Sequence, residues 1–193
     1  MRLYLIGSLR NPKVPIIAKI LRDQGHEVFD EWYAAGPEAD DYWMHYEHAR
    51  GHSFAEALAG YPAEHVFRYD KHHLDRCEGA VLVLPTGKSG HLELGYMIGQ
   101  RKPGFILLDK EPERFDVMYR FASGIASDAF GLLFAISEWE KENAKRSERE
   151  RLAPASEDAV RLLWGDYGAP KMERPNVRPM RDGEERTESS DNR

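Results

Sequence analysis

The sequence has almost no cysteine, no surplus of basic residues and no long hydrophobic run. Cys77 is the single cysteine, so an intrachain disulfide is impossible and nothing indicates an oxidising compartment. The net charge of −6 argues against a nucleic-acid backbone as the main ligand. No apolar run approaches the roughly 20 residues that cross a bilayer, and the N-terminus lacks a signal-peptide pattern. We therefore expect a cytoplasmic protein whose partners include neither a membrane nor a nucleic-acid polymer.

The length and the remaining composition indicate one globular domain followed by a tail. The chain has 193 residues, of which 41% are hydrophobic and 31% charged, as in ordinary soluble domains. We place an α/β domain at residues 1–146. From residue 147 the composition shifts to Arg, Glu, Pro, Ser and Asn. Residues 147–193 are therefore predicted to form a charged tail that is largely disordered beyond residue 170.

Short apolar runs alternate with helical patterns in the first part of the chain. Residues 3–6 are predicted to form a buried strand that Gly7 ends, and residues 27–29 a second strand. Between them, Asn11 opens a segment whose apolar residues recur at helical spacing. Together they form a β-α-β unit, which implies parallel strands and a right-handed crossover.

The alternation continues along the chain. Residues 80–84 form an unbroken apolar run, which is typical of a strand covered on both faces. The other expected elements are helices at 63–77, at 91–100 and from 128 to about 145, and strands at 105–108 and near Ile125. The predicted fold class is α/β, an open parallel five-stranded sheet flanked by helices, Rossmann-like with a flavodoxin-like strand order. The ligand site of such a sheet lies at the carboxyl ends of the strands.

Residues 31–60 are rich in aromatic residues, and we expect a loop-and-helix segment near the mouth of the sheet. His45, His48 and His52 recur on one helical face in this segment, a spacing that can ligate zinc. Gly51 interrupts the helix and no fourth ligand is evident, so no metal site is predicted.

Three loops, at residues 7–11, 30–32 and 85–91, follow expected strands. The third contains Gly87-Lys88-Ser89 between a strand and a helix, as a P-loop does. A P-loop needs a glycine five residues before this Gly-Lys pair, where Leu82 stands inside the strand. The ATPase interpretation therefore fails. The small residues of the loop can instead bring backbone N–H groups close to an anion or a sugar hydroxyl at the helix start.

Glu93 follows this loop, and we expect it in the first turn of the next helix. The positive end of a helix favours an ionised carboxylate, which suits a nucleophile better than a general acid. The same pattern also fits an ordinary acidic residue at a helix start.

A resemblance to a known family bears on this choice. Its strongest part is the block Ser89-Gly90-His91-Leu92-Glu93-Leu94-Gly95-Tyr96. A turn at Lys102-Pro103, the opening strand Leu3-Tyr4-Leu5-Ile6-Gly7 and an aspartate, Asp70, ahead of the central strand accompany it. These features, over about residues 2–140, resemble the nucleoside 2-deoxyribosyltransferase superfamily, which includes nucleotide N-hydrolases.

The resemblance implies an enzyme that cleaves or exchanges the N-glycosidic bond of a nucleoside or nucleotide. Glu93 would attack C1′ of the sugar, Tyr4 would orient Glu93, and Asp70 would position the sugar or protonate the departing base. Ser89 and Gly90 would contact the sugar or a 5′-phosphate. It further implies a small-molecule substrate, no cofactor, and a homodimer or higher homo-oligomer.

Two departures from the family pattern favour a phosphorylated substrate. Thr86-Gly87-Lys88 stands where many relatives carry an aspartate, and Gly7-Ser8-Leu9-Arg10 replaces a Gly-Pro-Phe turn. Both changes add hydroxyl or cationic groups. The candidate substrate-binding residues are Gly7, Ser8, Arg10, Asp30, Trp32, Lys88, Ser89, Gly90 and His91.

Three of these candidates have an equally good alternative. Asp30 and Trp32 either stack against a base or ribose, or form a surface turn in which Trp32 covers the core. His91 either touches the substrate or only begins the helix.

Two other functions stay open at this stage. A glycohydrolase of NAD or a related dinucleotide could use a similar glutamate, and a non-catalytic nucleotide-binding module could use the same type of sheet. Whether water or a second base accepts the sugar is also undecided, so both hydrolysis and transfer remain.

Overall fold

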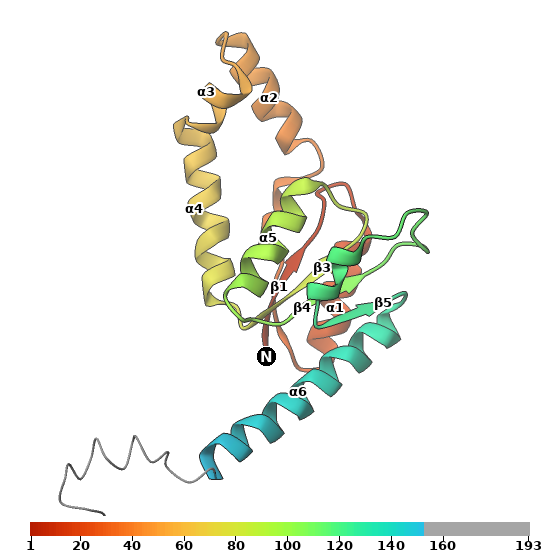
Figure 1. Cartoon of the computed structure of the whole chain (residues 1–193). Helices are drawn as coiled ribbons and strands as arrows, with labels where there is room; N and C mark the ends of the chain where they lie inside the picture. Colours follow the sequence, from red (N-terminus) through yellow and green to blue (C-terminus); the bar gives the residue numbers. More distant parts are fainter. Residues whose placement is uncertain (153–193) are drawn as a thin grey trace, which may run out of the picture. The chain divides into compact units, whose positions relative to one another are not determined.

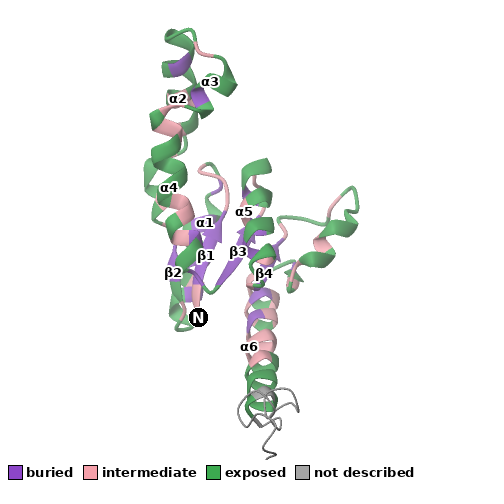
Figure 2. Ribbon diagram, turned by 60° about the vertical axis from the view of Figure 1, so that its left-hand side comes forward, coloured by how far each residue is buried: buried purple, intermediate pink, exposed green. Residues whose placement is uncertain are grey.

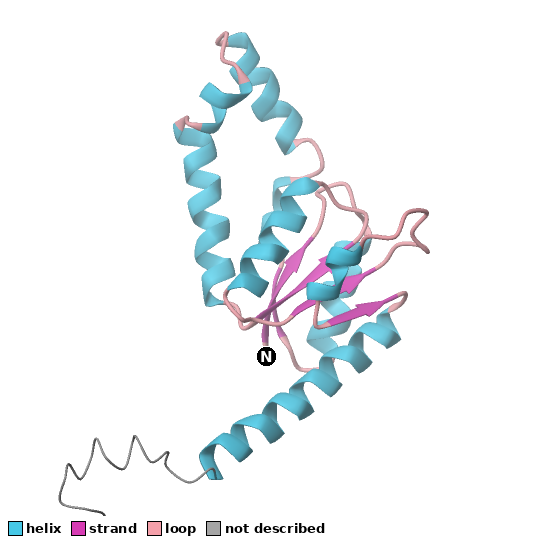
Figure 3. Cartoon of the chain, viewed as in Figure 1, coloured by secondary structure: helices cyan, strands magenta, loops and turns pink. Residues whose placement is uncertain are grey.

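A parallel sheet of five strands organises the structure, a computed structural model that describes residues 1–152. The strand order is β2-β1-β3-β4-β5, with all neighbours parallel, and the arrows in Figure 3 all point to one edge. The predicted α/β class and flavodoxin-like order are therefore confirmed. The strands are β1 (Arg2–Ile6), β2 (Glu27–Phe29), β3 (Gly79–Val83), β4 (Gly104–Leu107) and β5 (Gly124–Ala126).

Helices cover both faces of this sheet (Figure 1). On one face, α1 (Lys13–Asp23) and α6 (Ala129–Leu152) pack their apolar residues against alternate residues of the strands. On the other face lie α4 (Tyr61–Arg76) and α5 (Lys88–Gly99). Every residue of β3 and β4 is buried, which explains their unbroken apolar sequence.

Strand alternation assigns each residue of β1 to one of these faces. Leu3 and Leu5 belong to the core on the α1 side, whereas Tyr4 and Ile6 belong to the core on the α4 and α5 side, because successive side chains of a strand point in opposite directions. The Tyr4 side chain is therefore directed toward the helices that carry Asp70 and Glu93.

Two helices begin earlier than the sequence predicts. The expected helix at 63–77 begins at Tyr61, after Gly60 in an extended conformation and with a proline in its first turn. The expected helix at 91–100 begins at Lys88, after the extended N-cap Gly87. Neither N-cap glycine provides the side-chain oxygen that normally marks a helix start, so periodicity alone placed the boundaries too late.

The aromatic-rich segment forms several short helices. These are the 3-10 helix η1 (Glu31–Ala35), α2 (Ala39–Ala49) and α3 (Phe54–Leu58), the last of which begins with a capping box of Ser53 and Glu56. Only η1 packs on the core, through Trp32 and Tyr33. In Figure 1, α2 and α3 extend beyond the carboxyl ends of the strands, so the expected position at the mouth of the sheet holds for η1 alone.

The region between β4 and α6 contains a second 3-10 helix, η2 (Val117–Phe121), and the edge strand β5. The predicted tail starts within α6, and its remainder, residues 153–193, lies outside the described residues. Within residues 1–152, every helix is too short or too polar to span a membrane.

Candidate functional site

The structure brings the three predicted catalytic residues together on one face of the sheet. Tyr4 comes from β1, Asp70 from α4 and Glu93 from α5. Tyr4 is 1% exposed, and both carboxylates are half-buried. Each group influences the pKa of another: Asp70 raises the pKa of Glu93, and both acids raise that of Tyr4. The three side chains therefore form one electrostatic cluster.

Glu93 has the most perturbed carboxylate of this cluster. Burial, followed by the nearby Asp70 charge, raises the pKa of Glu93 to about 7. Burial also raises the pKa of Asp70, and the neighbouring Tyr4 hydroxyl reduces that increase. Asp70 Oδ1 is buried without a hydrogen-bond partner among residues 1–152. Burial and a neighbouring negative charge both favour the neutral acid, so near neutral pH Glu93 is partly protonated, with Asp70 beside it as a second site for the proton.

This protonation corrects the expectation that the helix end keeps Glu93 ionised. Because α5 begins at Lys88, Glu93 lies in its second turn, beyond the first turn in which the helix dipole acts strongly. Because Glu93 lies in the second turn, it is also not an ordinary acidic residue of the first turn. Burial controls the ionisation of this side chain.

Close packing at Gly90 places α5 against the sheet. A Cβ at Gly90 would lie 2.7 Å from Thr86 Oγ1 and 3.0 Å from Ile6 Cγ2. Any larger residue would push the first turn of α5 away from β1, and would move Glu93 away from Tyr4 with it. Gly90, predicted as a substrate contact, therefore has a structural role that accounts for it.

A network of polar contacts fixes α4 relative to α5. Asp75 of α4 accepts a hydrogen bond from the Tyr96 hydroxyl at 2.6 Å and pairs with Lys71 at 2.6 Å, and these partners hold the pKa of Asp75 well below its usual range. Lys102 donates to the backbone oxygens of Leu74 and Asp75 at 3.1 and 2.7 Å, which caps the end of α4. These contacts keep the helices of Asp70 and Glu93 in register.

Asn11 is a site-forming residue that the sequence indicated only as a helix start. It is 3% exposed, and its Nδ2 lies 3.2 Å from the Val83 oxygen and 3.3 Å from the Pro85 oxygen. Its Oδ1 accepts a hydrogen bond from the backbone N–H of Lys13 at 3.0 Å. One buried amide thus joins the loop after β1 to the loop after β3. In the sequence, only the position of this polar residue, shortly after the glycine that ends the first strand, could have indicated its role.

The loop after β1 makes its polar contacts within the protein. Ser8 Oγ accepts a hydrogen bond from the Arg10 backbone N–H at 3.2 Å, and the Arg10 guanidinium pairs with Asp41 of α2 at 2.6 Å. At Gly7, a Cβ would lie 2.6 Å from Val14 Cγ2, so the glycine permits the close approach of α1. The expected cationic contribution of Arg10 to phosphate binding is therefore partly neutralised by Asp41.

The two candidates after β2 are also engaged within the protein. Arg22 forms an ion pair with Asp30, and Trp32 Nε1 donates to the Leu5 backbone oxygen at 2.8 Å. Trp32 packs against both core layers. These contacts agree with the second of the two roles considered for these residues, a surface turn in which Trp32 covers the core.

The start of α5 carries the remaining candidates. Lys88 and Ser89 are exposed. The His91 ring contacts two parts of the protein. Its Nε2 lies 3.0 Å from the Tyr119 hydroxyl of η2, and its Nδ1 lies 3.1 Å from the backbone oxygen of Gly87. The His91 and Tyr119 rings stack with centroids 5.9 Å apart. Tyr119 of η2 is therefore a neighbour of this loop.

His45 and His48 of α2 and His52, which follows this helix, do not form a metal-binding group. His52 pairs with Glu47 at 2.6 Å, and no group of three or more potential ligands suited to a metal ion occurs in residues 1–152.

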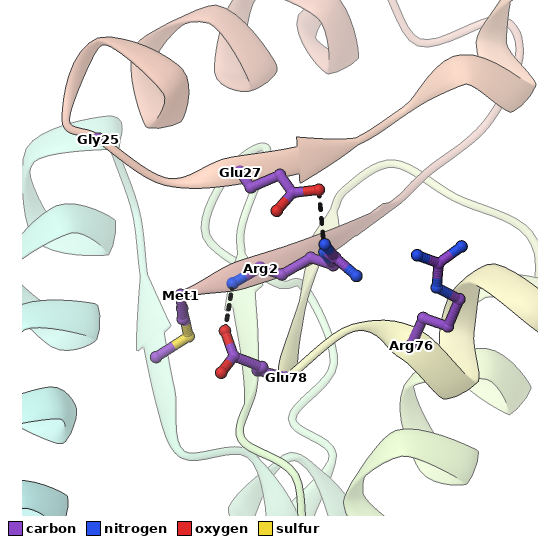
Figure 4. A pocket seen from close by; sticks show the side chains of 6 residues that line it. All are labelled: Met1, Arg2, Gly25, Glu27, Arg76 and Glu78. Carbon is purple, nitrogen blue, oxygen red and sulfur yellow. Dashed lines mark hydrogen bonds and ion pairs between the residues drawn. The ribbon is translucent and has the colours of Figure 1, made fainter.

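Two cavities lie elsewhere. One of about 460 Å³ is at the amino ends of β1 and β2, where the Arg2 side chain pairs with Glu27 at 2.9 Å and the Arg2 backbone N–H donates to Glu78 at 2.6 Å (Figure 4). Ligands of open α/β sheets bind at the opposite edge, so we interpret this cavity as structural. Another of about 370 Å³ borders β2 beside the stacked rings of Phe29 and His73.

Comparison with solved structures finds a likeness of low similarity. A solved structure of a 2-deoxyribosyltransferase from Bacillus psychrosaccharolyticus matches 68% of this chain and 90% of its own, with 19% identity and a TM-score of 0.48. No protein-family model matches the sequence, and no curated protein matches it either. The likeness concerns the path of the backbone.

Proposed function

We propose that this protein cleaves the N-glycosidic bond of a nucleoside or nucleotide, with Glu93 and Asp70 as its catalytic carboxylates. The observation that carries the proposal is their coupling: two half-buried acids from different helices share an environment in which the pKa of Glu93 rises to about 7. Partly buried acids with perturbed pKa values are candidates for acid–base or nucleophilic chemistry. The motif around Glu93 points to the same chemistry.

The shared proton suits this reaction. When the bond between C1′ and the base nitrogen breaks, its electrons go to the base, which must then gain a proton. Glu93 in its protonated form supplies that proton. As positive charge develops at C1′, ionised Glu93 becomes favourable and captures the sugar as an ester, while Asp70 relays the proton to the base. Water, or the N–H group of a second base, then takes the sugar from Glu93, and the proton that it loses returns to the two carboxylates, which restores the starting state.

The test is release of free base, followed by chromatography. Deoxynucleosides, ribonucleosides and their 5′-monophosphates are each incubated with the full chain, with and without an acceptor base. We expect base release from at least one of them. Glu93→Gln and Asp70→Asn should each lower the rate by roughly 10²- to 10⁴-fold, the usual contribution of a positioned acid or base.

The matched control is Glu64→Gln, which removes an exposed acid from the same helix as Asp70 and should leave the rate unchanged. Product identity separates hydrolysis from transfer, and the paired nucleosides and monophosphates test the preference for a phosphate. The proposal fails if no substrate releases base, or if Glu93→Gln keeps full activity. Nicotinamide release from NAD alone would favour the glycohydrolase alternative instead.

A further inference from the structure

The segment of residues 36–69, which contains α2, α3 and the first half of α4 and is here called the arm, has almost no core of its own. Among its residues only Glu47 and Ala57 are buried, and Figure 2 shows most of its ribbon in the colour of exposed residues. The Trp43 Nε1 and Glu47 Oε1 atoms are buried without hydrogen-bond partners within residues 1–152. So short a segment cannot normally stay folded without burying apolar surface.

The arm nevertheless carries large apolar side chains on all three helices. More than two-fifths of the surface of each is exposed, and for Tyr61 the exposed fraction reaches 80%. Such a concentration on a soluble protein usually marks an interaction surface. The exposed residues are Tyr42, Met44, Tyr46, Phe54, Leu58, Tyr61, Val66, Phe67 and Tyr69.

The sequence of α4 shows that this surface continues the core of the protein. Val66 and Phe67 precede Asp70 by four and three residues, and Leu74 follows Asp70 by four, so both apolar residues lie on the side of the helix that carries Asp70 and Leu74. Leu74 is 5% exposed against the sheet, whereas Val66 and Phe67 are 57% and 62% exposed. The apolar stripe of α4 therefore runs past the end of the sheet and has no cover there.

The charge of the arm narrows the choice of partner. It carries six acidic side chains and two arginines, and both arginines have an acidic neighbour, Glu47 for Arg50 and Glu64 for Arg68. A net acidic surface repels nucleic acid and anionic lipid headgroups. The partner that best complements the arm is therefore an apolar protein surface.

The exposed area matches what a stable dimer needs. At about 200 Å² for a fully exposed aromatic side chain, the nine residues expose on the order of 1,000 Å². A specific interface buries roughly 800 Å² on each partner. Two copies of the arm would supply this area to each other, and an apolar stripe can pair with its own symmetry mate without complementary charges.

From the exposed stripe, the missing core and the matching area, we propose that two copies of this chain associate through their arms, with Val66 and Phe67 of α4 and Tyr42 of α2 in the contact. The inference holds whichever reaction the candidate site carries out, because it rests on surface and packing alone.

Sedimentation velocity of the full chain tests the proposal. We expect a species of twice the 22.2 kDa mass of one chain at micromolar concentration. A double variant, Val66→Asp with Phe67→Asp, places two charges in the contact and should weaken the dimer by roughly hundredfold or more. Tyr42→Glu should act in the same direction. All three positions are exposed, so far-ultraviolet circular dichroism of the monomers should remain native.

The matched control is Phe130→Asp on α6, where the native side chain is 81% exposed but lies outside the arm. This variant should remain dimeric. The proposal is overturned if the full chain is a monomer at about 100 μM, far above the dissociation constant of a stable interface, as it would be if residues 153–193 covered the arm of their own chain. It is equally overturned if Phe130→Asp dissociates the dimer and the arm variants do not.

Discussion

Glu93→Gln should make the protein more stable at alkaline pH, although it removes a residue of the candidate site. The pKa of Glu93 rises from 4.5 to about 7 in the folded protein. Below the lower value both the folded and the unfolded chain hold the proton. As the pH rises from the lower to the higher value, the unfolded chain ionises first, so the wild-type protein loses stability across this window.

The size of that loss follows from the pKa change. Each pH unit between the two pKa values contributes about 1.4 kcal/mol, so the free energy of unfolding falls by on the order of 3 kcal/mol across the window. Glutamine has a similar shape and does not ionise. The Gln variant should therefore lack this loss and exceed the wild-type protein most above about pH 7. Because burial is the larger cause and Asp70 the smaller, Asp70→Asn should reduce the pH dependence without removing it.

Urea unfolding followed by circular dichroism between about pH 5 and pH 8 measures this difference. Glu142→Gln, which changes an exposed glutamate of α6, serves as the control and should follow the wild-type curve. If the curves of the wild-type protein and Glu93→Gln stay parallel over this range, the pKa of Glu93 is not raised by burial. The account of the shared proton would then be refuted.

Four further substitutions test the packing and the polar contacts around the cluster. Gly90→Ala should destabilise the protein by about 1–3 kcal/mol because its Cβ has no room, whereas Gly95→Ala in the same helix meets nothing within 4 Å and should stabilise it by about 1 kcal/mol; thermal unfolding compares them. Tyr4→Phe should raise the pKa of Asp70, since the Tyr4 hydroxyl lowers it, and carboxyl resonances in an NMR titration would show an unchanged pKa if the hydroxyl has no influence. Asn11→Ala should cost about 1–3 kcal/mol in urea unfolding, because it removes the Asn11 donor from the Val83 and Pro85 carbonyl groups; an unaltered midpoint would mean that the loops do not depend on it.

Several parts of the fold could be predicted from the sequence because they depend on local patterns. Short apolar runs marked β1, β3 and β4, and the helical spacing between residues 11 and 25 marked α1. The right-handed crossover then leaves few ways to order the strands. The arm was less predictable, since its aromatic residues suggest burial and the structure leaves them exposed.

Other features depend on residues far apart in the chain, and only the tertiary structure decided them. The partners of Arg10 and Trp32 lie on α2 and β1, where no local pattern could indicate them. The ionisation of Glu93 is the clearest case. Its sequence neighbours suggested a helix start that favours the charged form, but burial against the sheet and the approach of Asp70 favour the neutral form. A motif can supply a carboxylate, whereas its pKa depends on desolvation and neighbouring charges, which exist only once the chain has folded.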